Sequence, residues 1–220
     1  MKQFGIRMDG CEEPIEQLIK ERLSNTEKEF NYLEIGVAEC KTLLAVTQII
    51  LENKFNKNFT VIGLDLPTCG YVMDNLTNIS KKFQEIADFS ILFDNSNVQP
   101  DTVSLILNKN PREEIIPKLN CDLDFVFIDG CHGRNCVVSD FLAIEKKVKQ
   151  NGIVLFHDVG LEEQGTDWQD HCKENINVRQ AVIDLGLWDE TRVGWKILKY
   201  INGTRTTGGY GNSCAAFVKD

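Results

Sequence analysis

The stretch Leu123–Gly133 constrains the fold more than any other part of this chain. Residues 125–128 form an unbroken apolar run without alternation, which is typical of a strand whose two faces are both covered. The run stops at Asp129-Gly130, and His132 follows two residues later. Ligands of an open parallel sheet lie just outside the carboxyl ends of its strands, so the sequence predicts a functional site at the end of this strand.

Apolar runs alternate with helical patterns along most of the chain, as expected for a parallel sheet covered by helices. Strands are expected at residues 31–35, 60–65, 89–93, 125–128, 153–156, 192–200 and 214–219. Helices are expected near residues 11–29, 40–51, 72–87, 137–149 and 177–185, with one broken helix in the polar, proline-containing segment 98–120. The sequence therefore predicts an α/β fold: a doubly wound, mostly parallel, seven-stranded sheet with a C-terminal antiparallel hairpin.

The domain organisation follows from the same pattern. We interpret residues 1–29 as an N-terminal helical segment and residues 30–220 as a single domain. A long irregular loop near residues 160–175 is expected to act as a lid, because such loops in compact domains usually bind ligands or cover sites. The helix at 137–149 is expected to end at Asn151-Gly152, where a left-handed residue would terminate it.

Charge and cysteine content exclude several classes of protein. A formal net charge of −9 argues against a general nucleic-acid or anionic-membrane surface, and no apolar stretch is long enough for a membrane span. The N-terminus has neither the apolar core nor the cleavage pattern of a signal peptide. Eight scattered cysteines without a Cys-x-x-Cys pair are interpreted as reduced thiols of a cytoplasmic protein. Cys131, His132 and Cys136 fit no standard zinc spacing.

Polar residues stand at the ends of five expected strands. They are Glu34, Asp65, Asn95, Asp129 and Asp158. Turns favour Asp and Asn, which explains any single one, but five in phase along one sheet edge indicate the wall of a binding site. Asp65 is placed to accept hydrogen bonds from ribose hydroxyls, and Gly36 lets the backbone approach a ligand closely.

The turn at Gly36 also limits the ligand. It lacks the second and third glycines that let a pyrophosphate pack against the following helix, so a dinucleotide is disfavoured. S-adenosylmethionine, a nucleoside without a pyrophosphate, needs less room. A negatively charged wall also suits its sulfonium and ammonium groups better than phosphates.

Several motifs together resemble the class I S-adenosylmethionine-dependent methyltransferases. They are Glu34-Ile-Gly-Val-Ala-Glu-Cys40, Val61-Ile-Gly-Leu-Asp65, Asp94-Asn-Ser96, Phe127-Ile-Asp-Gly-Cys-His132 and Asn151-Gly-Ile-Val-Leu-Phe-His-Asp158. The closest resemblance is to the small-molecule O-methyltransferases that include the macrolide-sugar enzymes and the cephalosporin-hydroxylase-like proteins. It covers roughly residues 30–160 and implies a Rossmann-like fold.

The resemblance implies a role for each matching position in cofactor binding. Glu34 and Gly36 would line the methionine and ribose side, with Asp129 near them. Asp65 would hold the ribose, and Asn95 with Ser96 would flank the adenine.

The resemblance also implies a metal-assisted reaction. Asp129 and Asp158 would hold a divalent ion, usually magnesium, and we include His157 as a third ligand. His132 would act as the base, with Asp129 beside it as a second catalytic residue. The expected reaction is in-line methyl transfer to a hydroxyl group of a small molecule or sugar.

Two departures from the family pattern keep other functions open. Cys40 stands where the family has its second glycine, and Cys131 stands where it has an acid. One alternative is a cofactor-binding domain without methyl transfer, either hydroxylase-like or partner-binding. A second is a nucleotide-dependent oxidoreductase. The sequence does not identify the acceptor, and the amphipathic N-terminal helix leaves a homodimer open.

Overall fold

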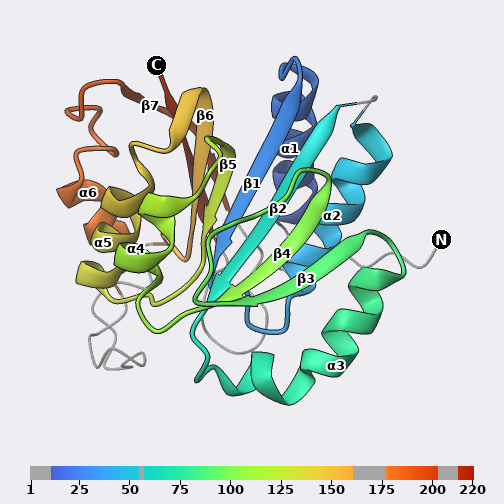
Figure 1. The fold of residues 1–220 in the computed structure, drawn as a ribbon. Helices are drawn as coiled ribbons and strands as arrows, with labels where there is room; N and C mark the ends of the chain where they lie inside the picture. The colour runs from blue at the N-terminus through green and yellow to red at the C-terminus, as the bar shows by residue number, and fades with distance from the viewer. Residues whose placement is uncertain (1–10, 55–56, 161–176, 203–212) are drawn as a thin grey trace.

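An eight-stranded sheet runs through the part of the chain that this computed structural model describes, residues 11–54, 57–160, 177–202 and 213–220 (Figure 1). The strands lie in the order β3-β4-β2-β1-β5-β6-β8-β7. Their bounds are β1 Glu29–Ile35, β2 Asn58–Asp65, β3 Asp88–Phe93, β4 Thr102–Leu107, β5 Leu123–Ile128, β6 Val148–His157, β7 Trp195–Ile201 and β8 Cys214–Lys219. Strands β1 to β6 pair in parallel, and β8 pairs antiparallel with both β6 and β7. The predicted doubly wound sheet with a C-terminal hairpin is confirmed.

Strand β4 is the one strand that the sequence analysis missed. It lies between β2 and β3 within the segment 98–120, where only a broken helix was expected. That broken helix exists as α4 (Pro111–Glu114) and the 3-10 turn η1 (Ile116–Lys118). The apolar run of β4 was hard to recognise as a strand because neighbouring parallel strands usually need a connection of about a dozen residues or more. Only residues 94–101 connect β3 to β4.

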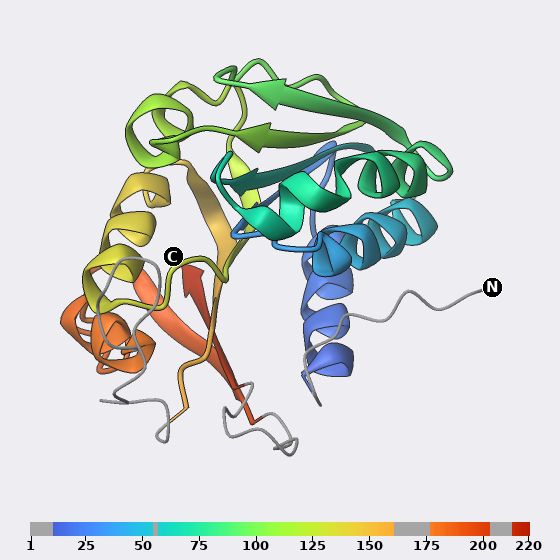
Figure 2. The same ribbon diagram turned by 90° about the horizontal axis from the view of Figure 1, so that it is seen from below.

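Helices cover both faces of the sheet (Figure 2). One face carries α1 (Glu12–Ser24), α2 (Lys41–Asn53) and α3 (Gly70–Gln84), and the other carries α5 (Arg134–Ile144) and α6 (Val178–Asp184) with α4 and η1. The apolar side of α1, a candidate dimer element in the sequence, is buried within the same chain. No helix in the described ranges is long and apolar enough to cross a membrane.

The parallel pairing places the predicted polar wall at one edge. Ile128 of β5 is level with Ile35 of β1 on one side and with Phe156 of β6 on the other. The residues that follow Ile128 and Phe156, Asp129 and His157, therefore emerge side by side. This register explains how residues 28 positions apart meet at one site.

The end of the helix before β6 differs from the prediction. Helix α5 ends at Ile144, whereas Asn151 and Gly152 lie inside β6. Asn151 does adopt the expected left-handed conformation, with φ 60°. The pairing register between β5 and β6 shifts at this point, so the left-handed residue serves an irregularity in the strand and not a helix end.

A buried carboxylate ties the opposite end of the sheet together. Asp124 of β5 is fully buried, and its oxygens accept hydrogen bonds from Arg22 of α1 at 2.7 Å and Lys149 of β6 at 2.8 Å. The backbone N–H of Asn31 in β1 donates to the same carboxylate at 3.0 Å. Asp124, near the start of β5, thus joins α1, β1 and β6 at the end of the sheet opposite the carboxyl edge.

Candidate active site

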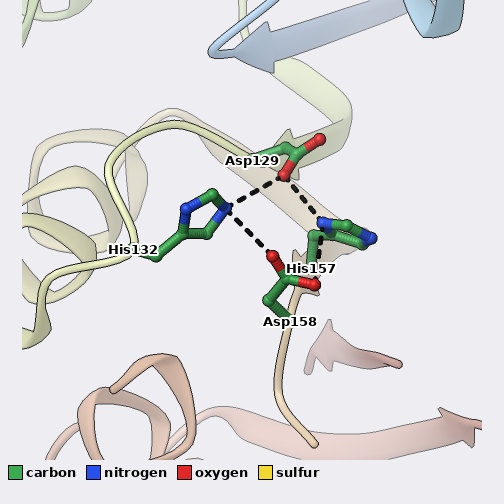
Figure 3. Close-up of side chains that lie close together, drawn as sticks. All are labelled: Asp129, His132, His157 and Asp158. Carbon is green, nitrogen blue, oxygen red and sulfur yellow. Dashed lines mark hydrogen bonds and ion pairs between the residues drawn. The ribbon is translucent and has the colours of Figure 1, made fainter. Parts of the chain in front are cut away.

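Two histidines and two aspartates meet at the carboxyl ends of β5 and β6 (Figure 3). Asp129 and His132 belong to the turn between β5 and α5, while His157 ends β6 and Asp158 follows it. One ligand atom of each residue lies within 4.8 Å of those of the other three. The side chains are only 11–24% exposed. We call these four residues the His/Asp cluster.

Asp129 is the hub of the cluster. Its Oδ1 lies 2.8 Å from His157 Nδ1 and 3.4 Å from His132 Nε2. Asp158 reaches the same two rings, with Oδ2 at 3.2 Å from His132 Nε2 and Oδ1 at 3.3 Å from His157 Nδ1. Each imidazole therefore lies between two carboxylates, as the dashed contacts in Figure 3 show.

Backbone features at Asp158 and at His132 hold the His/Asp cluster in place. Asp158 adopts a left-handed conformation with φ 57°, which few residues other than glycine, Asn and Asp accept readily. The backbone N–H of Asn177, which also caps α6, donates to the carbonyl of His132 at 3.0 Å. The turn that carries His132 is therefore held against the start of α6.

Burial and mutual attraction shift the pKa values of Asp129 and His157 in opposite directions. Burial alone would raise the pKa of Asp129, but the charge of His157 and the hydrogen bonds from both imidazoles lower it to about 2. Burial alone would lower the pKa of His157, but Asp129 and Asp158 raise it well above its usual value. Without a bound cation, the pair is therefore most stable as aspartate and imidazolium.

This pair makes the stability of the metal-free protein depend on pH. The raised pKa of His157 stabilises the fold fully below its unfolded value of about 6.5, and the contribution is lost as pH rises through the folded pKa. The lowered pKa of Asp129 stabilises the folded state at pH values above the unfolded pKa of about 3.9. This contribution is lost as pH falls toward about 2. Urea unfolding in EDTA should show a free energy of unfolding that falls above about pH 6.5, by at most about 1.4 kcal/mol per pH unit. Asp129→Asn should flatten this slope, and equal slopes in both proteins would contradict the account.

The composition and spacing of the cluster fit a divalent cation. Carboxylate oxygens and imidazole nitrogens are both protein ligands for such ions. Neighbouring ligands around an ion with bonds of about 2.1 Å lie roughly 3.0–3.4 Å apart, and the four N···O separations here are 2.8–3.4 Å. Asp158 Oδ1 and His157 Nε2 are buried without a hydrogen-bond partner in the described structure. This Asp158 oxygen lies 3.3 Å from His157 Nδ1 as an ion pair and makes no hydrogen bond, so it can still coordinate a cation.

In the loop after β1, every second residue from position 36 to position 40 has a left-handed backbone conformation. They are Gly36 with φ 85°, Ala38 with φ 43° and Cys40 with φ 56°. Gly36 lies directly against the chain at Asp129, since a Cβ atom there would come within 2.4 Å of the Asp129 carbonyl oxygen. Cys40, which stands in place of a family glycine, is only 2% exposed and packs into the core. It does not line the cavity described next.

A cavity of about 350 Å³ lies beside this loop and reaches Asp129 of the His/Asp cluster. Its lining residues are Glu34, Gly36, Val37, Ala38, Glu39, Lys41, Thr42 and Asp129. The volume is within the range of small-molecule sites. Asp129 belongs to both features, so a ligand in the cavity would lie against the His/Asp cluster.

Glu34 gives this cavity a buried acid. It is 2% exposed and accepts a hydrogen bond from the Tyr32 hydroxyl at 3.1 Å. Burial, followed by the charges of Asp129 and Asp65, raises its pKa well above the usual value despite that hydrogen bond. A cationic ligand would reverse this shift, because it would favour the ionised carboxylate.

The predicted cofactor residues differ in where they lie. Asp65 supports the loop from behind, since its Oδ2 accepts from the backbone N–H groups of Val37 at 3.0 Å and Ala38 at 3.1 Å. Asn95 and Ser96 follow the edge strand β3, which β4 separates from β2, and they do not line the cavity. Their roles at the ribose and adenine stay predictions.

Sequence reasoning missed Asn108 at this edge. It follows the unrecognised strand β4, is 1% exposed, and its backbone N–H donates to the carbonyl of Asp65 at 3.2 Å. Its side-chain amide donates to Asp94 at 2.7 Å and Glu114 at 3.0 Å. The apolar run before it was the signal that could have revealed it.

Two other expectations of the sequence analysis concern residues outside the His/Asp cluster. Cys131 and Cys136 are not among the four residues of the His/Asp cluster. The predicted lid at 160–175 falls almost entirely outside the described residues. The described part of the chain stops at Gly160 and resumes at Asn177.

Comparisons with known proteins give a consistent picture. Residues 33–159 match a protein family described as a methyltransferase domain. A protein of Acanthamoeba polyphaga mimivirus, described as uncharacterized, is 28% identical over 173 residues, which are 76% of this chain and 68% of that one.

Solved structures share the fold at low sequence identity. An O-methyltransferase from Bacillus cereus in complex with SAH has a TM-score of 0.62 at 14% identity, over 94% of this chain and 79% of its own. TomG, an O-methyltransferase of tomaymycin synthesis from Streptomyces achromogenes in complex with SAM, has a TM-score of 0.58 at 14% identity over the same shares. Cofactor-bound Rv0187 from MTB has a TM-score of 0.62 at 13% identity, over 98% of this chain and 83% of its own.

Proposed function

The chain belongs to the methyltransferase-domain family, and on that premise we propose that it transfers a methyl group from S-adenosylmethionine to a hydroxyl of a small molecule or sugar. The observation that carries this proposal is the shared position of Asp129. It lines the cavity beside the glycine loop and is also the hub of the His/Asp cluster. A methyl donor in the cavity would therefore lie next to groups that can bind a cation and move a proton.

The charge of the cavity favours S-adenosylmethionine over a dinucleotide. Glu34 and Asp129 offer carboxylates to a sulfonium or an ammonium, while Gly36 is the only glycine in a loop that would have to wrap a pyrophosphate. Asp65, behind the same loop, is our candidate for the ribose hydroxyls. Asn95 and Ser96 are the candidates for the adenine.

The His/Asp cluster would prepare the acceptor hydroxyl. Asp129, Asp158 and His157 would hold a divalent cation, for which the resemblance implies magnesium. A bound cation of this kind lowers the pKa of a hydroxyl and makes it a better nucleophile.

His132 is our candidate for the base. Its Nε2 takes the hydroxyl proton as the new C–O bond forms and the sulfonium C–S bond breaks, and S-adenosylhomocysteine leaves. Asp129 and Asp158, at 3.4 and 3.2 Å from that nitrogen, stabilise the resulting imidazolium. A positioned base contributes about 10²–10⁴-fold to such a reaction.

The same chain properties restrict the acceptor and the compartment. A net charge of −9 disfavours nucleic acid, so we propose a small hydroxylated molecule. We place the enzyme in the cytoplasm because its eight cysteines are scattered along the sequence and form no Cys-x-x-Cys pair.

The proposal is tested with S-adenosylmethionine that carries a deuterated methyl group. Two sources of acceptor are used: the first is a panel of catechols and glycosides, and the second is a small-molecule extract of cells. Mass spectrometry should detect an O-methylated product together with S-adenosylhomocysteine when the wild-type protein is present. The product should be absent when the protein is left out. Binding of the donor without any methylated product from either source would contradict methyl transfer. It would favour the cofactor-binding alternative.

A further inference from the structure

The His/Asp cluster has a ligand set that differs from the one magnesium prefers. Magnesium takes oxygen ligands and usually keeps several waters. Here His157 Nδ1 lies 2.8 Å from Asp129 Oδ1 and 3.3 Å from Asp158 Oδ1, so a nitrogen stands inside the group of atoms that would surround the ion. Imidazole suits the first-row transition metals, which also accept carboxylate oxygens.

The position of His157 makes this nitrogen hard to avoid. Its side chain is 11% exposed, and its ring lies edge-on to Phe127 with centroids 6.1 Å apart, so the ring is held by packing. Figure 3 shows Nδ1 directed at the two aspartates and Nε2 directed away from them. An ion bound by both carboxylates would therefore also meet Nδ1.

The second histidine differs in origin and packing. His132 lies on the turn after β5, is 21% exposed, and approaches the aspartates with Nε2. It is the more accessible of the two rings and is our candidate for the base. The ligand set is then one imidazole and two carboxylates, and the remaining coordination positions would be taken by solvent or an acceptor oxygen.

We infer that this site takes a first-row transition-metal dication, such as manganese, iron(II) or cobalt, in preference to magnesium, with His157 Nδ1 as the selecting ligand. The inference rests on the proposed function for the location of the ion but not for its identity. Methyl-donor binding, measured on the same samples, separates the two. Loss of donor binding with metal preference intact would contradict only the proposed function.

The first test compares metals on the full-length, metal-free protein. Cobalt(II) binding is followed by its visible absorption, manganese by electron paramagnetic resonance, and magnesium by competition against each. Cobalt and manganese should bind at least about 100-fold more tightly than magnesium. Equal or tighter binding of magnesium would overturn the inference.

The second test assigns the selectivity to His157. His157→Ala should lower the cobalt affinity by about 10–100-fold and leave the magnesium affinity unchanged, whereas His157→Asp should strengthen magnesium binding. Asp74→Asn, at an exposed carboxylate on α3, is the surface control and should change neither. His132→Ala is the matched imidazole control and should retain the cobalt preference. Loss of that preference in His132→Ala but not in His157→Ala would overturn the assignment.

A third measurement needs no variant. Pulsed electron paramagnetic resonance of the manganese-loaded wild type should show ¹⁴N modulation from a directly bound imidazole. Manganese bound without any nitrogen modulation would overturn the inference even if the His157 variants failed to fold.

Discussion

Asp129→Asn is expected to lower kcat for methyl transfer by about 10²–10⁴-fold while the protein stays folded. The asparagine keeps the shape of the side chain but removes the charge that faces both imidazoles and the cavity. The cation would lose a ligand, and the imidazolium formed at His132 would lose a counter-charge. The rate is measured with an acceptor found in the screen above, under saturating methyl donor.

Asp65→Asn is the matched control, because it changes a carboxylate at the same sheet edge that lies outside the His/Asp cluster. Its expected effect is a raised KM for S-adenosylmethionine with a smaller change in kcat. If both substitutions changed only KM, Asp129 would be a binding residue and its catalytic assignment would be wrong.

Gly36→Ala is expected to remove methyl-donor binding, with at least a 100-fold loss of affinity, or about 2.7 kcal/mol. Its Cβ would lie 2.4 Å from both the Asp129 carbonyl oxygen and the Gly130 Cα. Because both atoms belong to the backbone, the strands β1 and β5 must separate or the loop must move. Either change would disturb the cavity and displace Asp129.

The same substitution should also destabilise the fold, measured by urea unfolding. The left-handed conformation costs an alanine roughly 1–2 kcal/mol, and overpacking adds roughly 1–3 kcal/mol. Gly194→Ala isolates the first contribution, since Gly194 has φ 82° but nothing within 4 Å of an added Cβ. Equal destabilisation by the two substitutions would show that the contact with Asp129 is absent in solution.

The fold was largely predictable because buried parallel strands have a simple sequence pattern. The run at 125–128 and the run at 153–156 both appear as strands, and both end at the polar residues expected. Strand β4 escaped because its short apolar run lies among prolines and follows a connection shorter than parallel strands usually need. Asn151 shows a further limit, because a left-handed residue has the same sequence signal in a strand irregularity as at a helix end.

The sequence predicted those parts of the candidate site that depend only on where neighbouring parallel strands end. Asp129, His157 and Asp158 meet because neighbouring parallel strands end level with each other. The placement of Asn95 depended instead on which strand lies beside β2, and the missed strand moved it to the outer edge. Asp65 accepts hydrogen bonds from the backbone N–H groups of Val37 and Ala38. The loop also has left-handed conformations at Ala38 and Cys40, which alanine and cysteine do not signal in a sequence.

Calorimetric titration with S-adenosylmethionine and S-adenosylhomocysteine tests the central claim most directly, with NAD as the rival ligand. We predict micromolar binding of both adenosyl compounds, no binding of NAD, and at least 100-fold weaker adenosyl binding by Gly36→Ala, equivalent to about 2.7 kcal/mol. Failure of a folded sample to bind either adenosyl compound would contradict the assignment, and binding of NAD instead would favour the nucleotide-dependent oxidoreductase.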